Sequence, residues 1–220
     1  MKSAIVFGST GFVGSHLLGE LLKSPDYGSV TAVIRKPSSI THPKLRMLIG
    51  DYSSFADMMS GIAAEEVFIT LGTTKANSPD EAEYYQVDHD YPVLAARVAK
   101  EGGAKSVFLL TAIGANPNSR LFYVRTKGET ERDIIAHNFD HTHIFRPSMI
   151  TGNRKEKRSL LEGALMRAWP ALNPLLRWKA DKYRGMSGPD IARAMIKSAK
   201  NQTEKLQIYQ WREMHELLQR

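Results

Sequence analysis

Residues 4–14 read AIVFGSTGFVG, an apolar run that leads directly into three glycines spaced three residues apart. The run predicts a buried strand, and Val13 with the leucines that follow it at helical spacing predicts an amphipathic helix after the turn. Gly8 allows a tight turn, Gly11 lets the backbone approach a phosphate, and Gly14 lets the helix pack close to the strand. The helix start also offers unpaired N–H groups and a positive dipole end. This order predicts a site for the pyrophosphate of a dinucleotide, formed by Gly8, Ser9, Thr10, Gly11, Phe12, Val13 and Gly14.

Strand-like and helix-like segments alternate along the rest of the chain. We expect strands at 30–34, 44–49, 67–71, 106–110, 143–145 and 206–209, and helices at 55–62, 79–100, 122–137, 188–199 and the C-terminus. Such alternation predicts an α/β fold with a doubly wound, mostly parallel sheet and right-handed crossovers. Ligands of these folds bind beyond the carboxyl ends of the strands. The polar motifs considered below all follow strands, as that geometry requires.

Length and composition fit a soluble protein with one domain over residues 1–220. Hydrophobic residues make up 42% and charged residues 24% of the chain, and the absence of cysteine excludes disulfides and thiolate metal sites. No apolar run approaches the roughly 18 residues of a membrane span. Met1 lies directly before the first strand, so we expect no secretory signal and a cytoplasmic location. His141 and His143 alternate at a strand start without a third ligand, so no metal site is expected.

The formal charge of +7 is concentrated in one segment. Residues 151–186 hold nine basic and three acidic residues and include no predicted strand, so we expect a basic cap over the site within the single domain. Such a zone attracts anions, and the expected partner is a small-molecule substrate that could be anionic. No aromatic residues interleave with the bases as single-stranded nucleic acid would need, so no specific nucleic acid is expected. The tryptophans and leucines at 169–178 leave open a lid, a contact of a homodimer rather than a monomer, or peripheral membrane contact.

Tyr123 and Lys127 lie four residues apart and therefore on one face of the predicted helix at 122–137. A free tyrosine has a pKa of about 10, and an adjacent ammonium favours the phenolate and lowers that pKa. Tyr123 can then pass a proton to a carbonyl oxygen as hydride reaches the carbon. Lys127 would hold the nicotinamide ribose, and Thr111, at the end of the preceding strand, would orient the substrate oxygen. These three residues are the predicted catalytic group.

The end of the second predicted strand indicates which nucleotide is preferred. About 20 residues after the glycine turn, NAD-binding proteins present an acidic side chain to the ribose 2′-hydroxyl. This chain has Arg35 and Lys36 there. Two cations suit a 2′-phosphate, and a guanidinium can bind it through two hydrogen bonds. With an added hydroxyl from Ser9 or Thr10, the sequence predicts NADP(H) in preference to NAD(H).

Taken together, these motifs resemble the Rossmann-type short-chain dehydrogenase/reductase superfamily in its atypical NAD(P)H-binding branch. More narrowly, the chain resembles bacterial relatives of the Tat-interacting-protein oxidoreductases. The matching pieces cover about two-thirds of the chain in the family's order: 8–14, 71–74, 87–91, 109–111, 114–115, 123–129 and 145–147. The resemblance implies a small, mostly helical C-terminal cap. It also implies that Asp51 lies near the adenine, that Leu71, Gly72 and Thr73 lie beside the pyrophosphate and ribose, and that Pro147 to Ile150 lie near the nicotinamide.

One departure from the family pattern concerns the reaction more than the cofactor. The family usually has serine at the substrate-orienting position, often as a Ser-Ser pair, whereas this chain has Thr111-Ala112. The leading interpretation is an NADP(H)-dependent oxidoreductase that transfers hydride to a small carbonyl compound with a Tyr123/Lys127 proton relay. A non-catalytic NADPH-binding sensor or interaction protein is the first alternative. An enzyme similar to nucleoside-diphosphate-sugar epimerases is the second.

Overall fold

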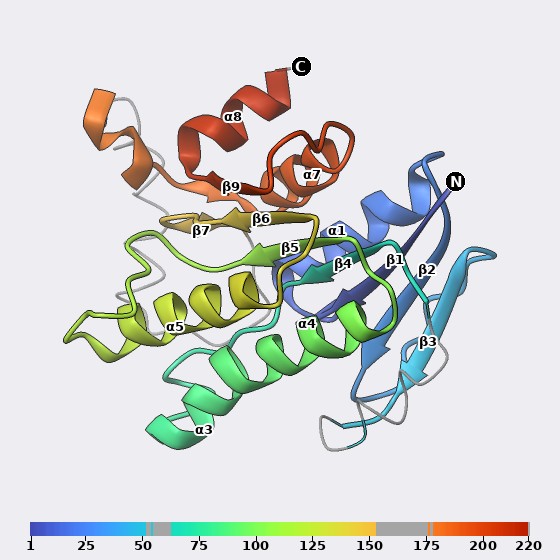
Figure 1. Ribbon diagram of the computed structural model, residues 1–220, viewed down its shortest axis with the longest axis horizontal. Coiled ribbons are helices and arrows are strands. Elements are labelled where there is room, and N and C mark those ends of the chain that lie inside the picture. Colours follow the sequence, from blue (N-terminus) through green and yellow to red (C-terminus); the bar gives the residue numbers. More distant parts are fainter. Residues whose placement is uncertain (52–53, 55–62, 153–175, 177, 220) are drawn as a thin grey trace.

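The computed structural model describes residues 1–51, 54, 63–152, 176 and 178–219. The helix predicted at 55–62 and most of the basic segment, including its apolar residues at 169–175, lie outside these residues. Within them, the chain alternates strands and helices in the expected order (Figure 1). The strands are β1 (Lys2–Phe7), β2 (Tyr27–Ile34), β3 (Leu45–Ile49), β4 (Glu66–Ile69), β5 (Ser106–Leu110), β6 (His141–Phe145), β7 (Ile150–Thr151), β8 (Met186–Ser187) and β9 (Leu206–Tyr209). The helices are α1 (Phe12–Lys23), α3 (Glu81–Tyr85), η2 (Gln86–Asp90), α4 (Tyr91–Glu101), α5 (Phe122–Ala136), η4 (Trp178–Tyr183), α7 (Gly188–Ser198) and α8 (Trp211–Gln219).

Seven strands form one parallel sheet in the order β3-β2-β1-β4-β5-β6-β9. The order runs outward in both directions from β1 and β4, so the chain reverses its winding between these two strands. A doubly wound sheet opens a crevice at such a point, beyond the carboxyl ends of the strands. The predicted fold class is confirmed.

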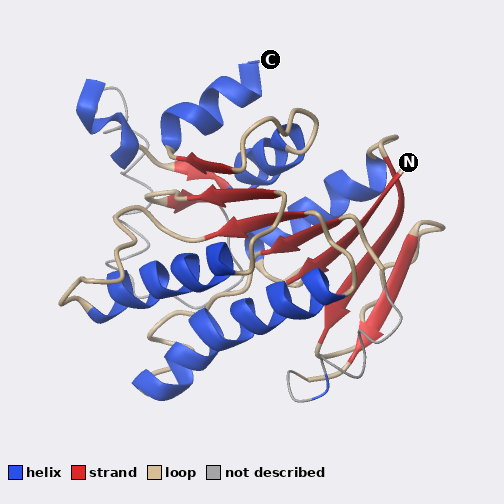
Figure 2. Cartoon of the chain, in the orientation of Figure 1, coloured by secondary structure: helices blue, strands red, loops and turns tan. Residues whose placement is uncertain are grey.

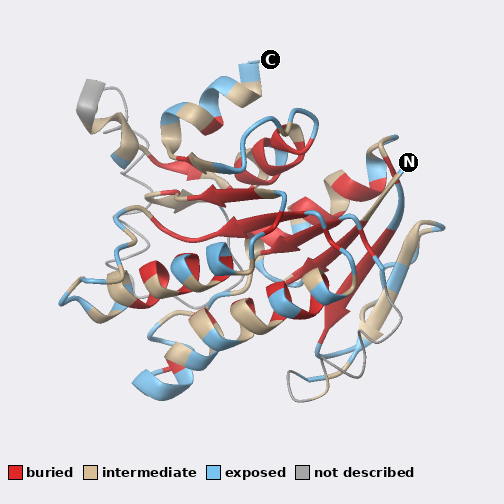
Figure 3. Ribbon diagram, in the orientation of Figure 1, coloured by how far each residue is buried: buried red, intermediate tan, exposed pale blue. Residues whose placement is uncertain are grey.

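Helices cover both faces of the sheet (Figure 2). On one face α1 and α7 pack against each other, with Leu17 and Leu21 in the same apolar cluster as Ile191 and Met195. On the other face α4 and α5 lie side by side over a second cluster that includes Ile134. The inner strands β2, β1, β4, β5 and β6 are buried along most of their length, whereas the edge strands β3 and β9 are not (Figure 3). Apolar burial on both faces explains why these strands read as continuous hydrophobic runs.

The C-terminal part is helical and also completes the sheet. Ser187 caps α7 by accepting the N–H of Asp190 at 3.2 Å, β9 pairs with β6, and α8 packs on α7. The expectation of no strand within 151–186 is wrong at its edges, because β7 and β8 form a small parallel pair. This pair joins the two ends of the segment. In the described part of the chain, no helix has the length and hydropathy to cross a membrane.

The helix predicted at 79–100 is three consecutive segments. Asp80 caps α3 by accepting the N–H groups of Ala82 and Glu83 at 3.0 Å, and the wider π-helical turn η2 separates α3 from α4. At the end of α3, Tyr84 is buried and Tyr85 is partly buried. π-Helical turns inside α-helices often occur at functional sites. Asp88, in the middle of this turn, is buried.

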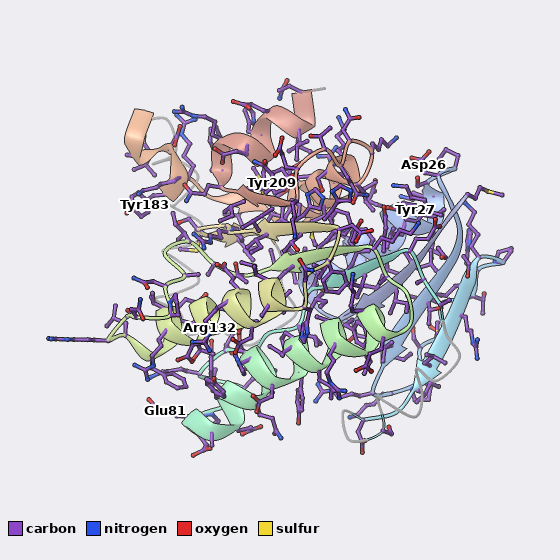
Figure 4. The ribbon with its side chains drawn as sticks, viewed as in Figure 1. Asp26, Tyr27, Glu81, Arg132, Tyr183 and Tyr209 are labelled. Carbon is purple, nitrogen blue, oxygen red and sulfur yellow. The ribbon has the colours of Figure 1, made fainter. Side chains whose placement is uncertain are left out.

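His143 lies in the core, where its side chain is buried. Its ring stacks on Phe108, with centroids 4.7 Å apart, and its Nδ1 is 2.9 Å from the hydroxyl of Tyr209, which is labelled on β9 in Figure 4. Burial lowers the pKa of His143 to about 4, with a smaller contribution from His141. His143 is therefore a neutral core residue.

Candidate functional site

The glycine turn after β1 has the tight geometry expected of a phosphate cradle. Gly8 has φ +86°, and a Cβ there would lie 2.8 Å from the backbone carbonyl of Thr70. A Cβ on Gly14 would lie 2.1 Å from the carbonyl oxygen of Gly8, so only glycine lets α1 start this close to the strand. Gly11 is exposed, precedes α1, and no side chain caps the helix start. An uncapped helix N-terminus with an open approach fits a dinucleotide pyrophosphate.

A cavity of about 600 Å³ opens beside this turn at the carboxyl ends of the strands. Its volume lies within the usual range of small-molecule sites. Among the predicted site residues, the cavity brings together three groups from distant parts of the chain. The first group is Gly11, Phe12 and Val13 from the turn, and the second is Leu71, Gly72 and Thr73 from the loop after β4. The third group is Thr111 after β5, Tyr123 and Lys127 on α5, and Ile150 on β7.

The remaining predicted residues do not line this cavity. Ser9 is buried, and its hydroxyl has no hydrogen-bond partner in the described structure, whereas Thr10 is exposed. Pro147 is buried, and its carbonyl accepts the N–H of Ile113 at 2.9 Å. Gly8 packs against the backbone of Thr70 and Gly14 against the carbonyl oxygen of Gly8, and neither glycine lines the cavity. Arg35, Lys36 and Asp51 are exposed and lie outside the cavity lining.

Arg35 and Lys36 are exposed directly after β2, and Asp51 is exposed shortly after β3. Arg35 and Asp51 both act electrostatically on Tyr91 at the start of α4. Burial raises the pKa of Tyr91, Arg35 lowers it, and Asp51 raises it. Arg35, predicted to bind the 2′-phosphate, and Asp51, predicted to lie near the adenine, are therefore both close to Tyr91.

Tyr123 and Lys127 occupy successive turns of α5 with contrasting burial. Tyr123 is 43% exposed, whereas Lys127 is only 7% exposed. Burial by itself lowers the pKa of Lys127, but Asp88, with smaller contributions from Tyr123 and Glu131, raises it above its ordinary value. The ammonium is therefore charged at neutral pH, and its field reaches the Tyr123 phenol.

Asp88 is a residue of the cavity lining that the motif analysis did not single out. Its carboxylate is fully buried, forms an ion pair with Lys127, and accepts the backbone N–H of Thr73 at 2.8 Å. The only sequence signal was its place within the motif at 87–91, since its partner is far away in the chain. Asp88 thus joins α5 to the loop after β4.

Thr111 lies on the cavity wall, but its hydroxyl has a protein partner. It donates to Oε1 of Glu131 at 2.6 Å, and the same carboxylate accepts Nε of Arg146 at 2.9 Å. Thr111 and Glu131 are both buried. The substrate-orienting role predicted for Thr111 therefore competes with this hydrogen bond, and the adjacent Ala112 has no hydroxyl to offer.

Aromatic side chains form part of the cavity wall that sequence reasoning missed. Tyr84 is buried, its ring meets that of Phe122 edge-on with centroids 5.8 Å apart, and both line the cavity with Tyr123. Burial, followed by Asp88 and Tyr123, raises the pKa of Tyr84, so its phenol stays protonated. In the described residues, no group of three or more histidines and acids is placed to hold a metal ion.

The strand order and the cleft at the carboxyl ends of the strands define a Rossmann-type protein with a doubly wound sheet. A family model described as NAD(P)H-binding matches residues 8–167, and the chain belongs to this family. The match begins at the first glycine of the turn. It therefore includes the turn, the loop after β4 and the Tyr123/Lys127 helix.

Curated relatives are fungal proteins named FMP52, mitochondrial. The protein of Candida glabrata is 36% identical over 155 residues, which cover 70% of this chain and 66% of that protein. The protein of Saccharomyces cerevisiae is 33% identical over 159 residues, covering 71% and 69% respectively. These names contradict the expected cytoplasmic location, which is therefore wrong. That expectation rested on seeing no secretory signal before the first strand, and this criterion does not distinguish one compartment inside the cell from another.

Solved structures share the fold at low identity. A UDP-N-acetylglucosamine 4-epimerase from Methanobrevibacter ruminantium, in complex with UDP-N-acetylmuramic acid, aligns with a TM-score of 0.69 at 18% identity and covers 95% of this chain and 76% of that one. The enzyme WbmH of Bordetella bronchiseptica, in complex with NAD+, gives a TM-score of 0.69 at 15% identity over 96% and 75%. At these identities the likeness establishes the fold alone.

Proposed function

We propose that this protein is an NADP(H)-dependent oxidoreductase that reduces a small carbonyl compound, with Tyr123 as the proton donor. The observation that carries the proposal is the shared cavity, which the glycine turn, Tyr123 and Lys127 line together. A nucleotide phosphate at the turn and a carbonyl at Tyr123 then fit one continuous space.

In this reaction Tyr123 and Lys127 have different roles. When bound, the reduced cofactor supplies a hydride to the carbonyl carbon. Tyr123 donates its phenolic proton to the carbonyl oxygen, so the product is an alcohol, and solvent reprotonates Tyr123 because its side chain is partly exposed. Lys127 holds the nicotinamide ribose through its N–H donors and stabilises the transient phenolate.

The preference for NADP(H) rests on Arg35 and Lys36. Both cations are exposed directly after β2, where an acid would be needed to accept the ribose 2′-hydroxyl. Arg35 binds the 2′-phosphate in this proposal, and Asp51 lies near the adenine. Thr10, the exposed one of the two hydroxyl residues in the turn, supplies a further hydroxyl.

A second function is favoured by one specific observation. The Thr111 hydroxyl is bonded to Glu131, and Ala112 cannot replace it, so the usual substrate-orienting hydroxyl is not presented at the end of β5. A protein that binds NADPH without turning it over would tolerate this arrangement. The alternative is therefore an NADPH-binding regulator.

Turnover of NADPH with a panel of small aldehydes and ketones separates the two functions. If the protein is an enzyme, Tyr123→Phe should lower turnover at least 100-fold, which is the usual size of general acid catalysis. NADPH affinity should change less than threefold. Tyr85→Phe is the matched control, since Tyr85 lies on α3 outside the cavity lining and should leave turnover unchanged. If NADPH binds tightly and the wild type consumes none with any carbonyl compound, the regulator is the correct function.

A further inference from the structure

The buried ion pair of Asp88 and Lys127 links three parts of the site. One carboxylate oxygen of Asp88 contacts the ammonium on α5, and the other accepts the Thr73 N–H in the loop after β4. The backbone carbonyl of Asp88 accepts the hydroxyl of Thr130, which also lies on α5. The π-helical turn η2 is therefore fastened to both the loop and the helix.

The pair lies directly beside the loop that lines the cavity. A Cβ on Gly72 would lie 3.5 Å from Oδ1 of Asp88 and 3.7 Å from Nζ of Lys127. Both atoms therefore lie beside Gly72, at a distance that would put them in van der Waals contact with a side chain there. The ammonium is consequently held at the wall of the cavity rather than in solvent.

Burial makes this position costly for a charged lysine. Full burial without a partner can lower a lysine pKa by about 3–5 units, enough to remove the charge near neutral pH. The groups of the described chain that act on Lys127 are Asp88 on η2 and Tyr123 and Glu131 on α5, and Glu131 is itself paired with Arg146. Tyr84, on α3, acts on Asp88. Asp88 is the acid in direct contact with the ammonium.

We propose that Asp88 is a positioning residue that keeps Lys127 charged and fixed against the Gly72–Thr73 loop, so that its N–H donors remain available to the ribose of the bound cofactor. This inference rests on the proposed function, because it takes Lys127 to contact the nucleotide. It adds a second requirement to the site, namely a permanent counter-ion for the lysine.

The pH dependence of NADPH affinity, followed by nucleotide fluorescence between pH 7 and 9.5, tests the role of Asp88. In the wild type we expect constant affinity, because Lys127 keeps its proton throughout this range. Asp88→Asn retains the shape but removes the charge, so we expect affinity to fall at least tenfold as pH rises and Lys127 loses its proton. Asp133→Asn removes a carboxylate that pairs with His89 and Arg132 outside the cavity, and it should behave as the wild type.

The outcomes separate this inference from the proposed function. Lys127→Met should weaken NADPH binding at every pH. If it does, and Asp88→Asn shows the flat profile of the wild type, the role of Asp88 is overturned and the proposed function stands. If Lys127→Met binds NADPH as the wild type does, Lys127 does not contact the cofactor and both proposals fail at that residue.

A second measurement needs no change at Asp88. In NMR spectra of lysine-labelled wild-type protein, the side-chain signal of Lys127, assigned by its loss in Lys127→Met, should not titrate below pH 10. Titration between pH 7 and 9 would overturn the inference even if Asp88→Asn failed to fold.

Discussion

Gly14→Ala places a methyl group where the start of α1 touches the preceding turn. The added Cβ would lie 2.1 Å from the carbonyl oxygen of Gly8 and 2.6 Å from the hydroxyl of Thr70, both well inside normal contact distance. The helix start must move away by about 1.4 Å to reach a contact of roughly 3.5 Å. Overpacking of this kind costs about 1–3 kcal/mol, and the better helix propensity of alanine returns at most about 1 kcal/mol. We expect a net loss of about 1–2 kcal/mol.

The same displacement moves the N–H groups that would bind the pyrophosphate. We expect NADPH affinity to fall at least tenfold, which corresponds to about 1.4 kcal/mol of binding free energy. Thermal unfolding and fluorescence titration measure the two effects, and the melting temperature should drop by roughly 3–6 °C for a chain of this size.

Gly19→Ala is the matched control on the same helix. A Cβ at Gly19 meets nothing within 4 Å, so the substitution should only improve helix propensity and stabilise the protein by up to about 1 kcal/mol. NADPH affinity should not change. Equal stability and equal affinity for the two alanine variants would refute the argument that close contact between helix and turn builds the site.

Three other predictions follow from separate contacts. Because burial lowers the pKa of His143 to about 4, the unfolded chain binds a proton there more readily than the folded one between that value and its ordinary pKa of about 6.5. Stability should therefore fall as pH drops through this range, by about 3 kcal/mol in total, and urea unfolding should show a smaller fall in His143→Asn. Glu131→Gln leaves Arg146 without its carboxylate and should destabilise the protein by about 3 kcal/mol in denaturant titrations; an unchanged midpoint would contradict the buried pair. Arg35→Ala should weaken NADPH binding at least tenfold and NADH binding less than twofold in calorimetry, and equal losses would remove the argument for a 2′-phosphate.

Local signals in the sequence were sufficient for most of the architecture. The strands at Ser106–Leu110 and Leu206–Tyr209 agree with their predicted bounds, and the reading of the glycine turn agrees with its observed geometry. These features depend on residues adjacent in the chain. The π-helical turn at Gln86–Asp90 was not predictable, because helical periodicity assumes 3.6 residues per turn and carries no sign of a locally wider one.

The contacts that decide the chemistry of the site are mostly long-range. The Tyr123/Lys127 pair was visible because its members lie four residues apart, whereas the partner of Lys127, Asp88, comes from another helix. In the same way, Thr111 follows a strand as predicted, but its hydroxyl bond to Glu131 depends on how α5 packs beside β5. Spacing places a side chain on a face, and only the fold shows which group it meets there.

The most direct test of the account is a fluorescence titration of the purified protein with NADPH, in parallel for the wild type, Gly14→Ala and Tyr123→Phe. The account predicts saturable binding to the wild type, undiminished binding to Tyr123→Phe, and binding at least tenfold weaker to Gly14→Ala. No change in NADPH fluorescence with the wild type at millimolar nucleotide would contradict the assignment of the cleft.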